Sequence, residues 1–296
     1  MPLFSRCDGK LVRNLDPMRQ IIPYVMGKRN ESAVFHTTQW EIAEARAWLR
    51  NYNRTRRGGP QATLFHLVAY ACIKMLHQRP GLNRFVSGGR IYQRDGVWLS
   101  FAAKIHMTDD SPLATIKLRF DADIRFDECV DAFYEAVNTA RSGNTTRTDT
   151  EVRLLTMLPG PIVRAVFAAL RGLDRCNLLP AMLIEPDPLY TSMFLANLGS
   201  IHIDNAYHHL YEYGTCSLFG VVGGAKKSLV PGWRGQPETH EVLQAQWSFD
   251  ERVNDGFYCV ESLEILRRIM EDPDRYIDRG MEDAAGSEDS LISAGI

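Results

Sequence analysis

The sequence predicts an α/β fold, in which strands and amphipathic helices alternate along a single chain of 296 residues. Three observations support this class. Apolar residues recur at helical spacing in several segments, most clearly in residues 126–140, where Val130, Phe133 and Val137 share one face. Other segments alternate apolar and polar residues and end at turn signals such as Asp-Gly. The chain has no internal repeat, and its 45% of hydrophobic residues suffice for a sizeable core.

The N-terminal residues 1–38 contain the pairs Asp8-Gly9, Asp16-Pro17 and Ile22-Pro23. Such turn-rich punctuation predicts an extended arm rather than a helix. The apolar residues of this arm would suit packing over a neighbouring subunit. Residues 39–57 and 62–78 then predict an amphipathic helix and a second, more apolar helix.

The middle of the chain predicts three strands and two helical regions. Residues 90–105 alternate about Asp95-Gly96, which is a turn signal between two strands, and residues 112–118 form a third strand. The helix over 126–140 follows. After a polar loop, residues 152–173 predict a helical region that Pro159 and Pro161 kink.

The C-terminal part predicts strands over 190–195, 215–222 and 240–249, and a last long helix over 256–270. Residues 279–296 form an acidic, glycine-containing tail that closes on an apolar tip, Leu291, Ile292 and Ile296. We therefore divide the chain into an extended arm (1–38), one folded domain (39–278) and this tail (279–296).

Composition and charge argue against several classes of protein. Lys and Arg total 34 against 36 acidic residues, so the net charge of −2 gives no reason to expect nucleic acid or a membrane as a partner. The six cysteines form no C-x-x-C pair, and no secretory signal opens the chain, which favours reduced thiols in a cytoplasmic protein. Prolines and arginines interrupt the most apolar segment, 154–173, so it cannot span a bilayer. We expect a small molecule or a second copy of the chain as the partner.

One stretch, Trp247 to Phe257, organises the rest of the chain. It combines an alternating strand, a tight turn at Asp255-Gly256 and a helix that begins there. Such a sharply bent connection would aim the carboxylates of Glu251 and Asp255 at a common point. An aspartate before the first residue of a helix is also a good N-cap.

This stretch resembles the active-site segment of the chloramphenicol acetyltransferase superfamily, and in particular of the dihydrolipoyl acyltransferase (E2) core of 2-oxo acid dehydrogenase complexes. That family has His-x-x-x-Asp-Gly at the end of a strand, whereas this chain has Glu-Arg-Val-Asn-Asp-Gly over 251–256. Glu251 stands in the place of the catalytic histidine. Residues 62–83 (with the exit Pro-Gly-Leu-Asn), 194–200 (with Asn-Leu-Gly) and 216–222 resemble the family at the expected distances. The resemblance covers roughly residues 30 to 278.

The resemblance implies a two-layer α+β sandwich, a mixed sheet flanked by helices, as the building block of a homotrimer. In the family, the histidine deprotonates the acceptor in acyl transfer from coenzyme A, and a donor of the neighbouring subunit faces it across the trimer interface. The positions that could supply such a donor here are Ser192, Asn197 and Ser200. For Asn197 the alternative is a bulge or turn that fixes the end of the strand. The chain lacks the Asp-Lys-Ala lipoyl signature, so we expect no covalently bound cofactor and keep a coenzyme A thioester as the candidate substrate.

Glu251 is a weaker base than the histidine it replaces. Ordinary pKa values are about 8.5 for a thiol, about 6.5 for imidazole and about 4.3 for glutamate. The extra deficit of the glutamate is about 3 kcal/mol, on the order of a hundredfold in rate. Burial raises the pKa of a carboxyl group and could recover this deficit. In the family, the aspartate at the position of Asp255 is mainly structural and pairs with an arginine, for which Arg252 is the nearest candidate.

Other polar clusters have simpler interpretations. The only histidine cluster comprises His202, His208 and His209. Only Asp204 stands at ligand spacing, so we expect surface or interface histidines and no metal site. Arg54, Arg56 and Arg57 end a predicted helix, and we interpret them as a solvated helix end, with contact to a coenzyme A phosphate as the alternative.

Two functions from different classes are compatible with these residues. The first is a scaffold, an E2-like core that forms trimers and then a larger cage through its apolar C-terminal tip, with acyl transfer lost or vestigial. The second is an active coenzyme A-dependent acyltransferase that uses Glu251 as general base on a soluble acceptor. The sequence alone leaves open whether the chain is an enzyme.

Overall fold

The computed structural model describes residues 5–56, 58–104, 113–142, 155–201, 203–204, 206–231 and 235–278. Its main element is a seven-stranded sheet with the order β2-β10-β8-β7-β5-β6, to which β9 adds by pairing with β10. The strands are β2 (Ala33–Glu41), β5 (Val97–Lys104), β6 (Leu113–Phe120), β7 (Met193–Asn197), β8 (Leu218–Val222), β9 (Lys226–Pro231) and β10 (Pro237–Asp250). β7 runs parallel to β5 and β8, whereas β10 runs antiparallel to β2, β8 and β9. The sheet is therefore mixed, as expected.

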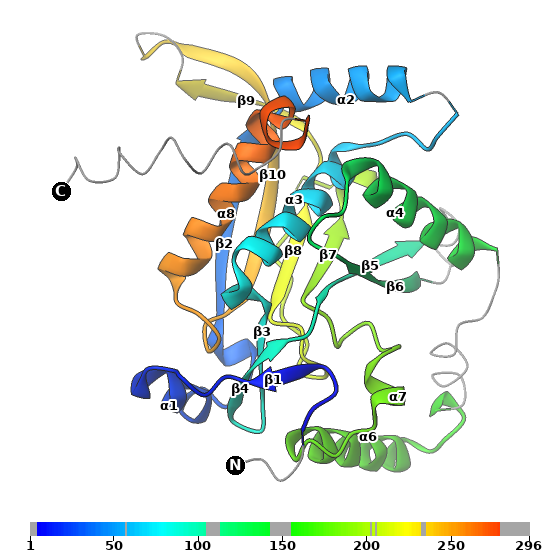
Figure 1. The fold of residues 1–296 in the computed structure, drawn as a ribbon, viewed down its shortest axis with the longest axis vertical. Helices are drawn as coiled ribbons and strands as arrows, with labels where there is room; N and C mark the ends of the chain where they lie inside the picture. Colours follow the sequence, from blue (N-terminus) through cyan, green and yellow to red (C-terminus); the bar gives the residue numbers. More distant parts are fainter. Residues whose placement is uncertain are drawn as a thin grey trace.

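Four long helices pack on one face of this sheet (Figure 1). They are α2 (Ala43–Thr55), α3 (Leu64–Gln78), α4 (Phe126–Arg141) and α8 (Gly256–Glu271). The apolar face of α3 is buried against the strands, and the rings of Trp40 and Trp247 meet edge to face at 6.4 Å beneath the helices. Each large apolar side chain buried in this way contributes about 1.5–3 kcal/mol. Helices on a mixed sheet confirm the predicted two-layer α/β fold.

The connection between β7 and β8 covers the opposite face of the sheet. Its His208 ring stacks on Phe219 at 3.9 Å between ring centres, and Phe219 stacks on Phe194 at 5.0 Å. Ser248 of β10 donates a hydrogen bond to the backbone oxygen of His208, which ties the connection to the sheet.

A second, smaller sheet has the order β1 (Gly9–Leu11), β4 (Arg90–Arg94), β3 (Arg84–Ser87). Arg6 fastens it to helix α6 (Gly160–Arg175), because its guanidinium group bonds Asp8 at 2.8 Å and Asp174 at 2.9 Å. The guanidinium of Arg94 lies 4.4 Å from the centre of the Phe85 ring in the same cluster. A short helix, α7 (Ala181–Ile184), follows α6.

The expectation of an extended N-terminal arm is wrong between Pro17 and Val25, where helix α1 forms. The carboxylate of Asp16 caps this helix by accepting the N–H of Met18 at 2.9 Å. Pro17 occupies the first turn, where a helix needs no backbone N–H. Asp-Pro is thus a helix start here rather than a turn. The arm is extended in β1 before this helix and again in β2, which begins at Ala33 and continues past residue 38.

The two strands on either side of Asp95-Gly96 form as expected, but they do not pair with each other. β4 pairs with β1 and β3, whereas β5 pairs with β6 and β7. Gly96 has a φ of +75°, which glycine adopts without strain, and the turn passes the chain from one sheet to the other. Single helical turns complete the described chain at η1 (Asn30–Ser32), η2 (Pro80–Asn83), η3 (Gly199–Ile201) and η5 (Asp274–Asp278).

The helical region around Pro159 is interrupted as expected, since α6 begins only at Gly160 with Pro159 before its first turn. The tail 279–296, with Leu291, Ile292 and Ile296, lies outside the described residues. Within the described ranges, no helix is both long and apolar enough to cross a membrane.

Candidate active site

The strand-turn-helix connection forms where the sequence places it. β10 ends at Asp250, residues 251–254 turn, and α8 begins at Gly256. Asp255 is the N-cap, and its carboxylate accepts the N–H of Tyr258 at 2.8 Å. The N-cap role expected for Asp255 is therefore present.

A cluster of buried charged side chains stabilises the turn from the protein interior. Asp250 is fully buried, and its carboxylate accepts two hydrogen bonds from the guanidinium group of Arg252, both at 2.8 Å. Ser32 donates to the same carboxylate at 3.0 Å, and Arg29 lies 3.6 Å from it. Glu212 adds a second acid beside Arg29, and hydrogen bonds from the backbone of Asn30 and Arg29 help to lower its pKa although partial burial opposes them. The negative charge of Asp250 is therefore neutralised by the neighbouring arginines.

Arg19 of helix α1 braces the turn from outside. Its guanidinium group pairs with the Asp255 carboxylate at 3.3 Å and donates to the backbone oxygen of Glu251 at 3.0 Å. The expectation that Arg252 would pair with Asp255 is therefore wrong. Arg252 points into the interior toward Asp250, two residues earlier, and is only 4% exposed. Sequence reasoning missed Arg19 because it did not predict the helix that carries it.

Glu251 itself lies exposed at the turn. Its backbone N–H donates to the oxygen of Ser32 at 2.9 Å, which fixes the main chain. Among the described residues, nothing hydrogen-bonds or ion-pairs with its carboxylate. The nearby thiol of Cys259 is buried, and burial raises its pKa to about 12, which favours the protonated, weakly nucleophilic form.

The Pro-Gly-Leu-Asn exit forms η2 and packs against the same turn. The N–H of Gly81 donates to the hydroxyl of Tyr258 at 3.1 Å. A Cβ on Gly81 would lie 2.8 Å from both the Asn254 amide and the Tyr258 ring. The backbone approaches so closely that only glycine fits. Val253 anchors the other side of the turn in an apolar cluster with Val86 and Ile91 of the small sheet.

All three candidate donors have structural roles within the chain. Ser192 is buried, and its hydroxyl accepts the N–H of Trp98 at 2.9 Å. Asn197 ends β7, and its side-chain oxygen accepts the N–H of Ser200 at 3.2 Å. The hydroxyl of Ser200 donates back to the Asn197 backbone oxygen at 2.8 Å. This local pattern is the turn that the sequence offered as the alternative for Asn197.

The sheet register separates Glu251 from Asn197 and Ser200 in one chain. Asn197 is level with Val222, and Val222 is level with Ala245 of β10. Glu251 follows Ala245 by 251 − 245 = 6 residues. At about 3.4 Å per residue this distance is about 20 Å along the strand. The structure therefore does not bring these site residues together within one chain.

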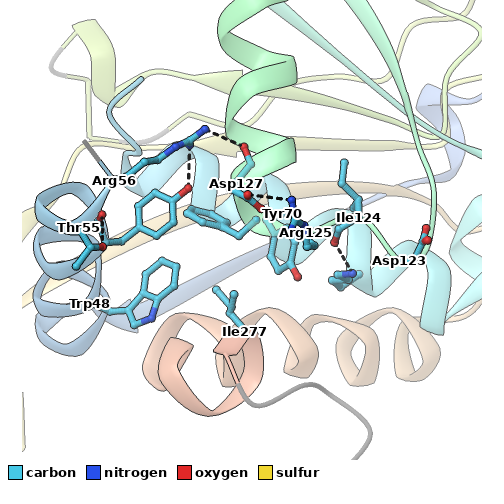
Figure 2. A pocket seen from close by; sticks show the side chains of 12 residues that line it. Trp48, Thr55, Arg56, Tyr70, Asp123, Ile124, Arg125, Asp127 and Ile277 are labelled. Atoms are coloured by element: carbon cyan, nitrogen blue, oxygen red, sulfur yellow. Dashed lines mark hydrogen bonds and ion pairs between the residues drawn. The ribbon is translucent and has the colours of Figure 1, made fainter. Parts of the chain in front are cut away.

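A cleft of about 600 Å³ lies elsewhere, between α2, α3 and the start of α4 (Figure 2). Aromatic rings line it, and Trp48 stacks on Tyr52 at 5.4 Å. Arg56 reaches over the cleft, but it pairs with Asp131 at 2.5 Å and donates to the Tyr52 hydroxyl at 2.8 Å. Arg54 bonds Asn51, and Arg57 lies outside the described residues. The pairing of Arg56 favours the solvated helix end over a phosphate contact.

No cluster of three metal-ligating side chains occurs among the described residues, which do not include His202. His208 and His209 stack on each other at 4.7 Å against the sheet.

The fold is that of the chloramphenicol acetyltransferase-like acyltransferases. Comparison of the sequence with family models and with curated proteins finds no match. The solved structures that this fold resembles include E2 catalytic cores. A probable dihydrolipoamide acetyltransferase from Listeria monocytogenes superposes with a TM-score of 0.58 at 12% identity, covering 88% of this chain and 94% of that one. The truncated 2-oxoacid dehydrogenase core from Thermoplasma acidophilum gives 0.57 at 15% identity, covering 89% and 99%. A chloramphenicol acetyltransferase gives 0.52 at 12% identity, covering 89% and 100%.

Proposed function

We propose that this chain is an E2-like acyltransferase-fold core that self-associates into threefold rings and then into a cage, with acyl transfer lost or vestigial. The proposal is supported by the Glu251 turn, which is held by buried and surface contacts and carries an exposed glutamate where the sequence resemblance expects the base of the family. A similar solved structure is described as the cubic core of the pyruvate dehydrogenase multienzyme complex, with a TM-score of 0.57.

Exposed apolar side chains lie beside the Glu251 turn and on the neighbouring strand β2. Met18 and Phe257 flank the Glu251 turn, and they are 68% and 79% exposed. Phe35 and Tyr207, which meet at 5.4 Å, lie exposed on β2 and on the connection that follows Asn197 and Ser200. This exposed apolar surface favours a second copy as the partner, which would bring Glu251 of one copy toward Asn197 of the next.

Assembly state tests the scaffold. We expect the full-length chain to give particles larger than a trimer by light scattering and negative-stain microscopy. A matched chain that ends at Asp278 lacks Leu291, Ile292 and Ile296, and we expect it to stop at trimers. A full-length chain that stays monomeric or trimeric at micromolar concentration contradicts the cage.

The alternative, an active coenzyme A-dependent acyltransferase, rests on the intact turn. A carboxylate becomes a stronger base when it is desolvated, and in one chain Glu251 is exposed, so a second copy would have to desolvate it. The six free cysteines fit the reducing, cytoplasmic setting in which we place either activity.

Release of free coenzyme A from acetyl-coenzyme A, separated by chromatography, with dihydrolipoamide and a panel of soluble acceptors, decides between the two. The scaffold proposal expects the wild type and Glu251→Ala to release coenzyme A at equal rates. A wild-type rate tenfold or more above that of Glu251→Ala would establish Glu251 as a base and overturn the loss of catalysis.

A further inference from the structure

Helix α6 differs from the other long helices of the described chain because none of its residues is buried. α2, α3, α4 and α8 each bury part of one face in the core. In Figure 1, α6 lies along one end of the molecule, away from the helices on the main sheet. Among the residues that the structure describes, only part of its apolar face has a partner, where Phe167 meets the ring of Tyr213 at 5.4 Å and Leu170 packs near Tyr190.

The rest of the apolar face of α6 is exposed, together with its flanking segments. Ile162 and Leu173 project from the helix with 48% and 39% exposure. Met157 before the helix and Met182 in α7 are 71% and 55% exposed. This surface is larger than the scattered single apolar residues that a soluble protein normally exposes.

The exposed charged side chains of α6 are arginines, and one exposed acid, Glu185, follows α7. Arg164, Arg171 and Arg175 are exposed, and their spacing of seven and four residues places them along one side of the helix. Asp174, the acidic residue of the helix, forms an ion pair with Arg6 at 2.9 Å. The helix therefore carries net positive charge in a chain whose overall net charge is −2.

We propose that α6 binds the surface of an anionic lipid membrane, lying in the plane of the interface. An amphipathic helix with arginines on its polar side and aliphatic and aromatic residues on the other is the type that inserts its apolar face into the headgroup region. With 16 residues, α6 is shorter than the roughly 20 that a spanning helix needs. We expected no membrane partner from the net charge of the whole chain, because that sum does not show the local excess of positive charge on α6.

A second copy of the chain is a weaker candidate for this surface. The matching acidic surface, Glu41, Glu44 and Glu271 around a cleft of about 550 Å³, lies beside α2 and β9 at the opposite end of the molecule in Figure 1. A contact from one end to the other is heterologous and gives open chains unless its rotation closes. A lipid surface satisfies the apolar and the basic parts together.

Vesicle co-sedimentation of the full-length protein tests the proposal. We expect binding to vesicles of phosphatidylcholine and phosphatidylglycerol (70:30), and weak binding to phosphatidylcholine alone. The triple variant R164Q/R171Q/R175Q should bind about 100-fold more weakly, since each arginine near an anionic leaflet contributes about a fivefold factor. The matched control R50Q/R54Q/R141Q removes three exposed arginines from α2 and α4 and should bind as the wild type does.

The same vesicle assay tests the apolar contribution. I162D/L173D should weaken vesicle binding, whereas the control L229D, which changes an exposed leucine of β9, should not. All variants should keep the wild-type thermal midpoint, since the changed side chains are exposed. The proposal is overturned if the wild type binds neither kind of vesicle, or if the two arginine triples bind alike. It is also overturned if I162D/L173D lowers the particle mass without lipid and leaves vesicle binding intact, which would make α6 a contact between copies.

Discussion

At the scale of single residues, the turn separates two aspartates with different roles. Asp250 is buried and neutralises Arg252, with Arg29 close by, whereas Asp255 caps α8 at the surface and pairs with Arg19. Sequence reasoning found the N-cap, because an aspartate before a helix start is a local signal. It could not choose the arginine partner of Asp255, because Arg19 lies 236 residues away in the chain.

The two aspartates therefore predict different costs on loss of charge. Asp250→Asn leaves the buried guanidinium of Arg252 uncompensated and should lower the free energy of unfolding by about 3–5 kcal/mol. Asp255→Asn keeps a good N-cap and loses only a partly exposed ion pair, at a cost under about 1 kcal/mol. Urea unfolding of both variants measures this difference, and equal losses would contradict the assignment of Asp250 as the buried anchor.

At the scale of elements, η2 packs closely against the start of α8 at Gly81. The motif resemblance gave the position of this segment, but the reason for its glycine is a close approach to Asn254 and Tyr258 that only the structure shows. By contrast, a Cβ on Gly256, the glycine of the Asp-Gly pair, would meet nothing within 4 Å.

The two glycines should thus respond differently to alanine. Gly81→Ala forces the Tyr258 ring or the Asn254 amide to move and should destabilise the protein by about 1–3 kcal/mol. Gly256→Ala adds a better helix former in open space and should be neutral or stabilising by up to about 1 kcal/mol. Thermal midpoints of the two variants test this order. The packing account fails if Gly256→Ala is the more damaging change.

The start of α3 gives the protein an acid-sensitive point. Nδ1 of His66 accepts the N–H of Thr63 at 3.1 Å, and burial, together with Arg56, lowers the pKa of His66 to about 4. The unfolded chain takes up this proton near pH 6.5, so stability from His66 is fully present above that pH and is lost as the pH falls toward 4. Burial also lowers the pKa of His208, which acts in the same direction.

A glutamine at position 66 can accept the same N–H without titrating, as in the Thr-x-x-Gln capping box. His66→Gln should therefore lose less stability than the wild type between pH 6.5 and pH 4, by at most about 3 kcal/mol. Urea midpoints at pH 7 and pH 4.5 measure the difference. Parallel losses in the two proteins would show that His66 does not set the acid sensitivity.

At the scale of the whole molecule, the α/β class, most of the long helices and the strand before the Glu251 turn could be predicted from periodicity. The assignment of strands to sheets could not, because β4 and β5 follow one another across a hairpin-type turn and still join different sheets. Periodicity reports which face of a strand is buried and not which strand lies beside it. The candidate site has the same limit, since Glu251 and Asn197 are about 20 Å apart in one chain and only an assembly would join them.

In our proposal the acyltransferase frame is intact, and only the replacement of the histidine by Glu251 removes the general base. Glu251→His restores the family's motif at an exposed position, where it should leave the particle mass unchanged. We expect this variant to transfer acetyl groups from acetyl-coenzyme A to dihydrolipoamide at least about a hundredfold faster than the wild type, since a positioned general base contributes about 10²–10⁴-fold. A Glu251→His protein of wild-type mass that is no more active than Glu251→Ala would contradict the claim.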